Sequence, residues 1–384
     1  MRRAYKFRLY PTKKQEKIFF FTLNRCRELY NAALSERRDS YKYTGRGVSY
    51  YEQKRDLPEI KNKIREEYQA IHSQVLQDVL LCLDNAMQAF YCRVKNGEVP
   101  GFPRFQERNR YDSFTYPQSG CTLSERHVIL SKIGRVQVKL HRAVQGDIKT
   151  ATVKYEAGQW YIVFSCEVEQ SAPLEAVESE VGIDLGITHF AALSDGTYIG
   201  SPRFIQGAYI NLKRKQQKLS KCKRGSHRRD RVHKQVAKAH RKVKNQRRDF
   251  HFKEAKKLVT HHQVIVFEDL QLTNLGKQVR PKQDEVTGMY LPNGASARSG
   301  LIKSILDNGL GQFVDIVTAK AEEAGRQVYK INLKNTSQVC SACGVKGPKK
   351  EVFFITLYHL HQENEEEVCD GKRRCAGYRE GCSF

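Results

Sequence analysis

Two short apolar runs constrain the fold most, because each carries an acidic residue that a buried strand tolerates poorly. Residues 181 to 187 alternate apolar side chains with Gly182, Asp184 and Gly186, and the glycines leave room beside the carboxylate for a metal ion or a phosphate. Residues 264 to 267 are continuously apolar, as parallel strands often are, and Glu268 follows at the edge where open α/β sheets bind ligands. A divalent-metal site at Asp184 and Glu268 is favoured over two ordinary strand-end acids.

A second constraint is the charge of residues 213 to 248, which contain seventeen Lys or Arg and one acid, Asp230. This segment carries +16 of the net charge of +25. Valines from Val232 to Val243 recur at helical spacing, and Gly225-Ser226 separates them from a preceding helix. The pattern predicts a basic helical hairpin. A charge run is often only a solvated face, but self-repulsion of this size favours binding to nucleic acid. The cations expected to contact it are Lys213, Arg214, Lys215, Lys221, Lys223, Arg224, Arg228, Arg229, Arg231, Lys234, Arg241, Lys242, Arg247 and Arg248.

The first hundred residues predict one strand followed by three helices. Apolar residues alternate with cations from Tyr5 to Leu9, a strand that Pro11 ends. Thr12 with Gln15 and Ser49 with Glu52 form capping boxes that begin two helices, and a third apolar helical stripe runs from residue 75 to 94. A helix-turn-helix that contacts a duplex is one interpretation of residues 12 to 95; three amphipathic helices that pack a core are the other.

Short strand signals follow, and Ala157-Gly158 marks a hairpin between residues 150 and 168. The first strand has no partner among the helices, so we expect it to pair here in a small barrel with a helical insertion. At 384 residues the chain should form two or three domains. No segment approaches the roughly 20 apolar residues of a membrane span, and no apolar leader follows Met1. We therefore expect a cytoplasmic protein with free thiols and no membrane partner.

The last forty-five residues hold five of the eleven cysteines. The run Cys340-Ser341-Ala342-Cys343-Gly344 has the chelating spacing of half a zinc ribbon. A redox pair or an incidental turn is the alternative. A redox Cys-x-x-Cys usually opens a helix after an early strand, whereas this one follows a long domain, so Zn²⁺ is favoured.

Six motifs in this order resemble the TnpB family, transposon-encoded RNA-guided nucleases related to type V CRISPR effectors. The resemblance covers nearly the whole chain up to about Lys350. The motifs are Phe7-Arg8-Leu9-Tyr10-Pro11, Gly101-Phe102-Pro103-Arg104-Phe105, Gly182-Ile183-Asp184-Leu185-Gly186, Phe267-Glu268-Asp269-Leu270, Gly309-Leu310-Gly311-Gln312-Phe313 and Thr336-Ser337-Gln338-Val339-Cys340-Ser341-Ala342-Cys343-Gly344.

The resemblance implies an α/β fold plus a small β-barrel: an RNase H-like (RuvC-type) nuclease domain with the basic hairpin and a zinc ribbon inserted. The implied domains are a wedge-type barrel at 1–11 and 96–178, a helical recognition lobe at 12–95, the nuclease domain at 179–335 and the ribbon region at 336–384. It also implies that Asp184 and Glu268 are the first and second catalytic acids, with Mg²⁺ or Mn²⁺ as cofactor. The implied partners are a guide RNA and target DNA, bound by a monomer.

The sequence departs from the family pattern after Lys350. The family has a second Cys-x-x-Cys and then an Asp-Arg-Asp-x-Asn-Ala run that supplies a third catalytic acid, and neither occurs here. We interpret this tail as a different reading frame or a truncated gene end. Cys369 and Cys375 are candidate zinc ligands, with His359 or His361 as substitutes, and Asp370 is the one acid placed to act as third carboxylate.

Three functions remain open at this point. The first is RNA-guided DNA cleavage by metal-dependent phosphodiester hydrolysis. The second is guided DNA binding without cleavage, favoured by the missing third acid. The third is a transposase that acts on transposon ends, disfavoured because the sequence has neither a complete acid triad nor a tyrosine set in a histidine motif.

Overall fold

The computed structural model describes residues 1–331, except 109, 170–171, 271–276, 278 and 285–286; residues 332–384 lie outside the described part. The chain divides into two compact units, Met1–Gln170 and Ser171–Phe384. No helix among the described residues is long and apolar enough to cross a membrane.

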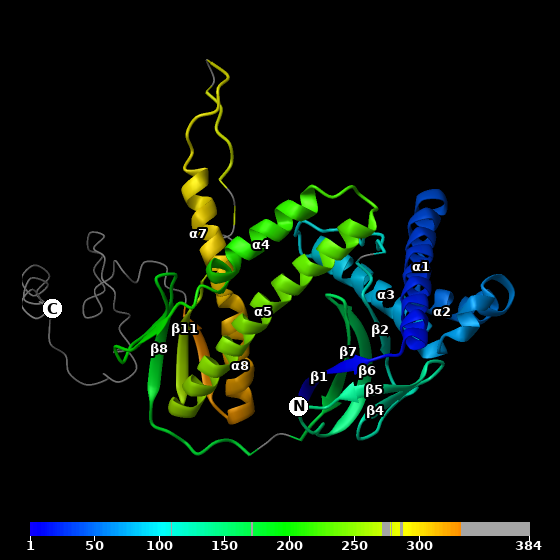
Figure 1. The fold of residues 1–384 in the computed structure, drawn as a ribbon, viewed down its shortest axis with the longest axis horizontal. Helices are drawn as coiled ribbons and strands as arrows, with labels where there is room; N and C mark the ends of the chain where they lie inside the picture. Colours follow the sequence, from blue (N-terminus) through cyan, green and yellow to red (C-terminus); the bar gives the residue numbers. More distant parts are fainter. Residues whose placement is uncertain (109, 170–171, 271–276, 278, 285–286, 332–384) are drawn as a thin grey trace, which may run out of the picture. The chain divides into compact units, whose positions relative to one another are not determined.

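The first unit is built on a seven-stranded antiparallel sheet in the order β2-β6-β7-β1-β5-β4-β3 (Figure 1). The first strand pairs with both β5 and β7, which confirms the expected partner segment. The order is open, with β2 and β3 at its edges, so closure into a barrel stays a prediction. The strands are β1 (Arg2–Tyr10), β2 (Ser113–Tyr116), β3 (Cys121–Leu123), β4 (His127–Leu130), β5 (Gly134–Lys139), β6 (Asp147–Glu156) and β7 (Gln159–Glu167).

The alternation seen in the sequence fixes which face of β1 is buried. Tyr5, Phe7 and Leu9 are at most 2% exposed and point into the core, while the cations between them point away from it. The β6–β7 turn has Ala157 and Gly158 at φ 50° and 80°, the positive values that a tight two-residue hairpin turn requires.

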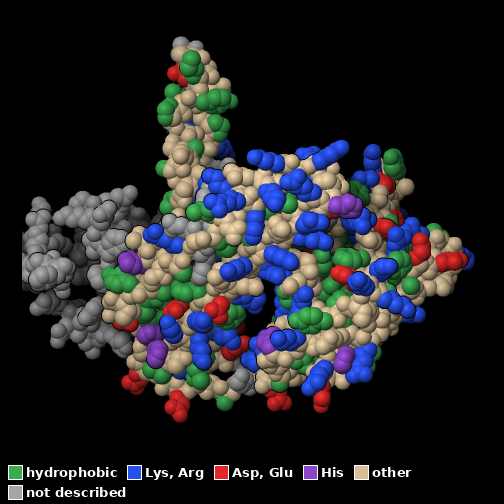
Figure 2. All heavy atoms as spheres, viewed as in Figure 1, with side chains coloured by type: hydrophobic (Ala, Val, Ile, Leu, Met, Phe, Trp, Pro, Cys, Tyr) green, Lys and Arg blue, Asp and Glu red, His purple; other side chains and the backbone are tan. Residues whose placement is uncertain are grey.

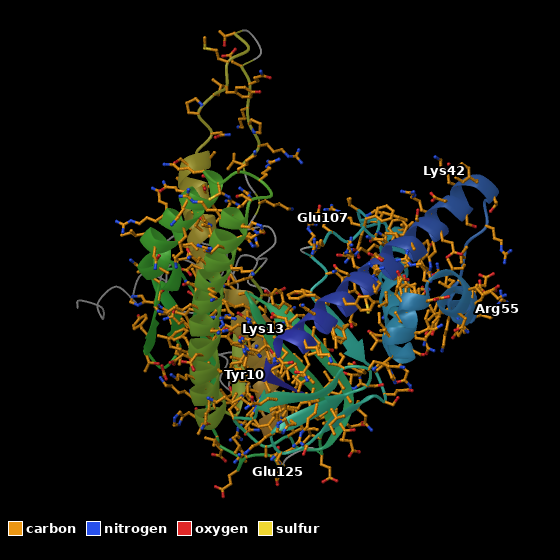
Figure 3. All side chains as sticks on the ribbon, turned by 45° about the vertical axis from the view of Figure 1, so that its right-hand side comes forward. Tyr10, Lys13, Lys42, Arg55, Glu107 and Glu125 are labelled. Atoms are coloured by element: carbon orange, nitrogen blue, oxygen red, sulfur yellow. The ribbon has the colours of Figure 1, made fainter. Side chains whose placement is uncertain are left out.

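Three helices lie between β1 and β2 in the chain, as the sequence predicts. They are α1 (Lys13–Thr44), α2 (Tyr50–Glu59) and α3 (Ser73–Lys95), with a π turn η1 (Ile60–Ile64) and a 3₁₀ turn η2 (Glu66–Ala70) between the last two. Figure 3 shows α1 running without a break from Lys13, beside Tyr10, to Lys42 at its far end. Its Phe19 ring packs against Phe114 and Trp160 of the sheet, with ring centroids 6.0 and 4.7 Å apart. The helices and the sheet therefore share one core.

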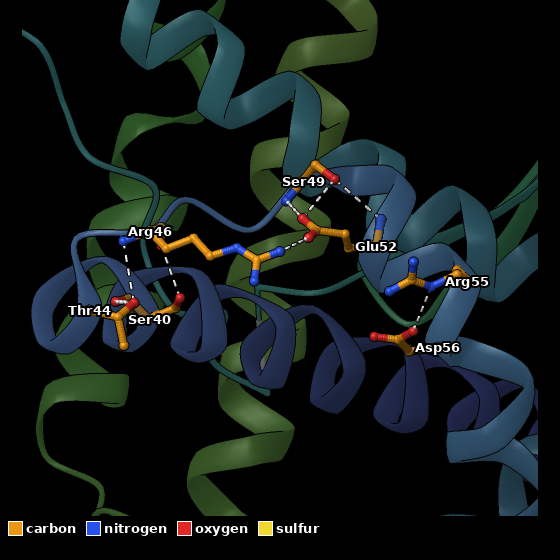
Figure 4. Close-up of polar contacts among 7 residues, drawn as sticks. All are labelled: Ser40, Thr44, Arg46, Ser49, Glu52, Arg55 and Asp56. Carbon is orange, nitrogen blue, oxygen red and sulfur yellow. Dashed lines mark hydrogen bonds and ion pairs between the residues drawn. The ribbon is translucent and has the colours of Figure 1, made fainter.

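Both predicted capping boxes are present. The Thr12 hydroxyl accepts from the Gln15 amide, and the Ser49 hydroxyl accepts from the Glu52 amide while the Glu52 carboxylate accepts from the Ser49 amide (Figure 4). The first helix ends at Gly45, whose φ of 69° suits a residue without a side chain. The Arg46 guanidinium then pairs with Glu52, so the short connection is fixed to the start of α2.

The second unit contains a five-stranded sheet in the order β10-β9-β8-β11-β12, in which β8, β11 and β12 are parallel and β9 and β10 antiparallel. A core of apolar residues joins the sheet to α5 and α8, with the Phe313 ring of α8 4.9 Å from Phe190 and 6.2 Å from Phe267. The elements are β8 (Glu180–Leu185), β9 (His189–Leu193), β10 (Tyr198–Gly200), α4 (Phe204–Ser220), α5 (His227–His261), β11 (Val264–Glu268), α7 (Ala295–Asn308), α8 (Leu310–Ala324) and β12 (Gln327–Ile331).

Candidate metal centre and nucleic-acid interface

The two predicted acids lie side by side at the carboxyl end of the parallel strands. The register of β8 on β11 places Ile183 opposite Phe267, and Asp184 and Glu268 are the next residues of each strand. Ile183 and Phe267 are 1% exposed and point into the core, so the alternation of a strand directs both carboxylates to the other face. The two carboxyl groups are close enough to share a hydrogen bond. The structure thus brings together two residues that are 84 positions apart in the sequence.

The electrostatics of this pair favour a cation. Burial, and then the neighbouring charge and hydrogen bond of Asp184, raise the pKa of Glu268 above its ordinary value. Two facing carboxylates in a partly buried place repel one another, and a hard divalent cation with oxygen ligands would relieve that repulsion. Among the described residues no cluster of three or more His, Cys, Asp or Glu is placed to hold a metal ion. The residues present fit two ligands of a Mg²⁺ or Mn²⁺ site, and Asp370 lies outside the described residues.

We expect Glu268→Gln to raise the melting temperature of the metal-free protein at pH 7. The pKa of Glu268 is higher in the folded protein than in the unfolded chain. The free energy of unfolding therefore falls as the pH rises from the unfolded-state pKa through the folded-state pKa, and it stays lowered at higher pH. The amide removes this loss of stability. Thermal unfolding in a chelator should show the variant more stable by a few degrees at pH 7, with the difference shrinking toward pH 4. A wild type that is the more stable of the two at pH 7 would contradict the repulsion.

The basic segment forms the expected hairpin of α4 and α5. Gly225 at φ 80° makes the break, and the Ser226 hydroxyl caps α5 by accepting from the Arg229 amide at 3.2 Å. The predicted valine stripe is buried, with Val232, Val236 and Val243 no more than 8% exposed. Figure 2 shows Lys and Arg side chains spread over the surface along these two helices. The sequence pattern therefore predicted both the hairpin and its apolar seam.

Two of the predicted contact residues also make contacts within the protein. The Arg229 guanidinium donates to the backbone oxygens of Leu219 and Cys222 at 3.0 and 3.1 Å, so it holds the end of α4 to the start of α5. The Arg247 guanidinium pairs with the Asp307 carboxylate at 3.3 Å. Arg229 lies off the valine stripe, and its two hydrogen bonds add a contact between the helices that the stripe does not provide. Nucleic-acid contact by all fourteen cations stays a prediction.

A matched pair of variants separates these roles. Arg228→Ala with Arg231→Ala removes two exposed cations and should weaken RNA binding while leaving the melting temperature unchanged. Arg229→Ala should instead lower the free energy of unfolding by about 1 kcal/mol, because two backbone carbonyls each lose one hydrogen bond. Filter binding and thermal unfolding of both proteins provide the measurements. If Arg229→Ala melted like the wild type, the structural assignment would fail.

The predicted zinc ligands Cys340, Cys343, Cys369 and Cys375, together with His359 and His361, lie outside the described residues. Zinc binding therefore stays a prediction. The cysteines of the described part are free thiols, as expected: Cys26, Cys82, Cys92, Cys121, Cys166 and Cys222.

Because Cys340 and Cys343 alone have the family spacing and a structural site needs four ligands, purified protein should hold less than one tightly bound zinc per chain. Metal analysis after dialysis measures this. One full equivalent that Cys369→Ser abolishes would show that the tail completes the site. One full equivalent retained in that variant would implicate His359 or His361 instead.

Sequence comparisons match three family profiles to this chain. One described as "Probable transposase" matches residues 163–278, one described as "Helix-turn-helix domain" matches residues 1–46, and one described as "Cas12f1-like, TNB domain" matches residues 311–375. Within 1–46 the structure has β1 and one unbroken helix, α1, rather than two helices joined by a turn. Duplex contact by the helical insertion therefore stays a prediction.

Relatives are similar over most of the chain. "Putative RNA-guided DNA endonuclease InsQ" of Escherichia coli (strain K12) is 30% identical over 375 residues, which cover 97% of this chain and 87% of that protein. A protein with the same designation, without the name InsQ, from Streptomyces pristinaespiralis is 28% identical over 351 residues, 90% of this chain and 81% of that one. A TnpB-like protein of Acanthamoeba polyphaga mimivirus is 23% identical over 206 residues, 51% of this chain and 37% of that protein.

One solved structure, titled "Cryo-EM structure of the Cas12f1-sgRNA-target DNA complex", aligns with 92% of this chain and 93% of its own. Its sequence identity is 11% and its TM-score 0.49.

Proposed function

Because this chain belongs to the TnpB family, as 30% identity across 97% of its length shows, we propose that it is an RNA-guided DNA endonuclease of a transposon. The observation that carries the proposal is the placement of Asp184 and Glu268 together at the carboxyl edge of the second unit's sheet. This arrangement fits metal-dependent hydrolysis of a phosphodiester. We propose that the protein acts as a monomer bound to its guide RNA, with target DNA as substrate.

The strand order supports an RNase H-like (RuvC-type) nuclease domain. Numbered along the chain, the strands β8, β9, β10, β11 and β12 lie in the order 3-2-1-4-5, with the first three antiparallel and the last two parallel to the first. The acids belong to the first and fourth of these strands, which are neighbours. The further proposed divisions are a wedge-type barrel at 1–11 and 96–178 with the helical lobe at 12–95, the nuclease domain at 179–335 and a ribbon region at 336–384.

The chemistry follows from these residues. Asp184 and Glu268 would hold a Mg²⁺ or Mn²⁺ ion through carboxylate oxygens, and the bound ion would supply Lewis acidity and a more acidic water. The parallel pairing of β8 with β11 ends at Ile183 and Phe267, so the two acids are the next residue of each strand and lie side by side. Exposed cations of the α4–α5 hairpin would hold the phosphates of the guide or of its duplex with the target.

A second candidate function is guided DNA binding without cleavage. It is favoured by the sequence itself, which has no Asp-Arg-Asp run after Lys350 and therefore offers two acids of the expected three, unless Asp370 serves as the third. Direct action on transposon ends as a transposase is the third candidate, and no contact in the described residues favours it.

Two assays separate these candidates. The protein, loaded with guide RNA in magnesium buffer, is given a labelled DNA duplex that matches the guide and one that does not. Binding that requires the match supports the two guided functions, and a cleavage product then distinguishes the nuclease from the binder. Robust cutting that Asp370→Ala eliminates would identify the third acid. Binding of transposon ends that needs no RNA would overturn the proposal in favour of a transposase.

A further inference from the structure

A buried asparagine contacts the strand end that carries Asp184. Asn308, the last residue of α7, is 5% exposed. Its side-chain nitrogen Nδ2 donates to the backbone oxygen of Gly186 at 3.1 Å, and its Oδ1 accepts from the Ser201 hydroxyl at 3.0 Å. Gly186 lies two residues after Asp184, and Ser201 directly follows β10. The Asn308 side-chain amide therefore links the residues that follow the C-terminal ends of β8 and β10.

The backbone of Asn308 is itself fixed from α5. The His251 ring, which is fully buried, donates from Nε2 to the Asn308 carbonyl oxygen at 2.9 Å, and Arg247 pairs with the preceding Asp307. Gly309 follows at φ 63°, and a Cβ there would come within 2.9 Å of the Arg247 side chain. Glycine is therefore needed for both the turn and the close approach of α5. Contacts with α5 therefore fix the junction between α7 and α8, independently of its contact with the end of β8.

The end of β8 needs such a contact because its pairing with β11 stops early. The described β8–β11 register ends at Ile183 and Phe267. Beyond that point Asp184 and Leu185 pair with β9 alone, and the Gly186 amide donates to the Phe190 oxygen at 3.2 Å. Gly186 has no side chain to pack, so its carbonyl is the group through which the α7–α8 junction can hold this end.

We propose that Asn308 is a positioning residue of the metal site: by holding Gly186 it fixes the direction in which the Asp184 carboxylate faces Glu268. The inference rests on the proposed function, because it assumes that the two acids bind a divalent cation. Groups that orient metal ligands without touching the metal typically change metal affinity by about 10- to 100-fold when removed. Asn308 is neutral, so its removal changes orientation and leaves the charge of the site unaltered.

The test measures Mn²⁺ binding to the full-length protein without nucleic acid, from the electron paramagnetic resonance signal of free Mn²⁺. Asn308→Leu keeps the side-chain size and removes both hydrogen bonds. Ser201→Ala removes one of them and leaves Asn308 in place. Arg326→Met is the matched control: Arg326 is 6% exposed and donates to the Val259 oxygen and to the Gln263 side chain. It directly precedes β12, so it lies at the opposite edge of the sheet from Asp184.

The Mn²⁺ dissociation constant should rise on the order of 10- to 100-fold in Asn308→Leu, rise by a smaller factor in Ser201→Ala, and stay at the wild-type value in Arg326→Met. Both Asn308→Leu and Arg326→Met should melt at lower temperature than the wild type. Arg326→Met therefore shows whether a loss of stability alone changes the Mn²⁺ affinity. A folded Asn308→Leu protein with wild-type affinity would overturn the inference, as would an equal loss of affinity in Arg326→Met. If Asn308→Leu does not fold, Ser201→Ala decides, and an unchanged constant there overturns the role.

Asp184→Asn distinguishes the metal site from the positioning role of Asn308. Wild-type protein whose Mn²⁺ binding is absent, or survives Asp184→Asn, contradicts the proposed metal site and with it the positioning role. Binding that Asp184→Asn abolishes and Asn308→Leu leaves unchanged contradicts the positioning role alone.

Discussion

Replacing Asp184 or Glu268 with alanine is expected to reduce guided, magnesium-dependent DNA cleavage by about 10³-fold or more, to below detection. The two carboxylates are neighbours on parallel strands, and each would be an anchoring ligand of the metal. Losing one removes several kcal/mol of charge stabilisation in the transition state, and each 1.36 kcal/mol is a factor of ten in rate. Because no Asp-Arg-Asp run follows Lys350, we also expect the wild type itself to cut more weakly than relatives that have this run, while its DNA binding remains.

The matched control is Asp195→Ala. Asp195 lies in the turn between β9 and β10, where its carboxylate accepts from the Thr197 amide and hydroxyl. Since β9 is antiparallel to β8, this turn is at the opposite edge of the sheet from Asp184. Cleavage by Asp195→Ala should equal that of the wild type in a time course of labelled duplex. Robust cutting by Asp184→Ala would remove the site assignment.

The second large effect is on binding. If about eight cations of the α4–α5 hairpin contact phosphates, the affinity for RNA should fall on the order of 10³- to 10⁵-fold between 50 and 200 mM salt. The physical reason is the release of counterions from the nucleic acid, one for each phosphate that a cation neutralises. Fluorescence anisotropy of a labelled RNA across a salt series gives the slope of log affinity against log salt.

The Arg228→Ala, Arg231→Ala double variant is the control for this slope. Removing two phosphate contacts should lower the magnitude of the slope of log affinity against log salt by about 2, or about 1 for each cation removed. A flat salt response in the wild type would show that the hairpin is a solvated surface without a polyanion partner. A slope unchanged in the double variant would place the phosphate contacts on other cations.

Local patterns in the sequence predicted the elements well, because each pattern reports one face of one element. The alternation from Tyr5 to Leu9 gave the buried side of β1, and the capping box at Thr12 gave the start of α1. The pairing of Phe7 with Ile162, far along the chain, had no local signal. It was reached only because the first strand has no partner among the helices.

The candidate site was half predictable for the same reason. An acid on each of two buried strands is visible in the sequence, whereas their adjacency depends on the parallel register of β8 and β11. Asn308 and His251 were missed, because their contacts form where a helix junction meets the end of a strand, and no periodicity marks such a place. The same limit explains Arg229, whose acceptors are the carbonyls of Leu219, near the end of α4, and of Cys222, in the turn that follows.

We expect an RNA guide to select the DNA that this protein binds. The protein is expressed together with the DNA that flanks its gene, and the RNA that it retains is identified. Its affinity for a DNA duplex that matches this RNA is then measured at 150 mM salt. The matched duplex should bind on the order of 10³-fold more tightly than a scrambled one, and ribonuclease treatment should abolish the difference. Equal affinity for matched and scrambled duplexes, or a preference that survives ribonuclease, would contradict the claim.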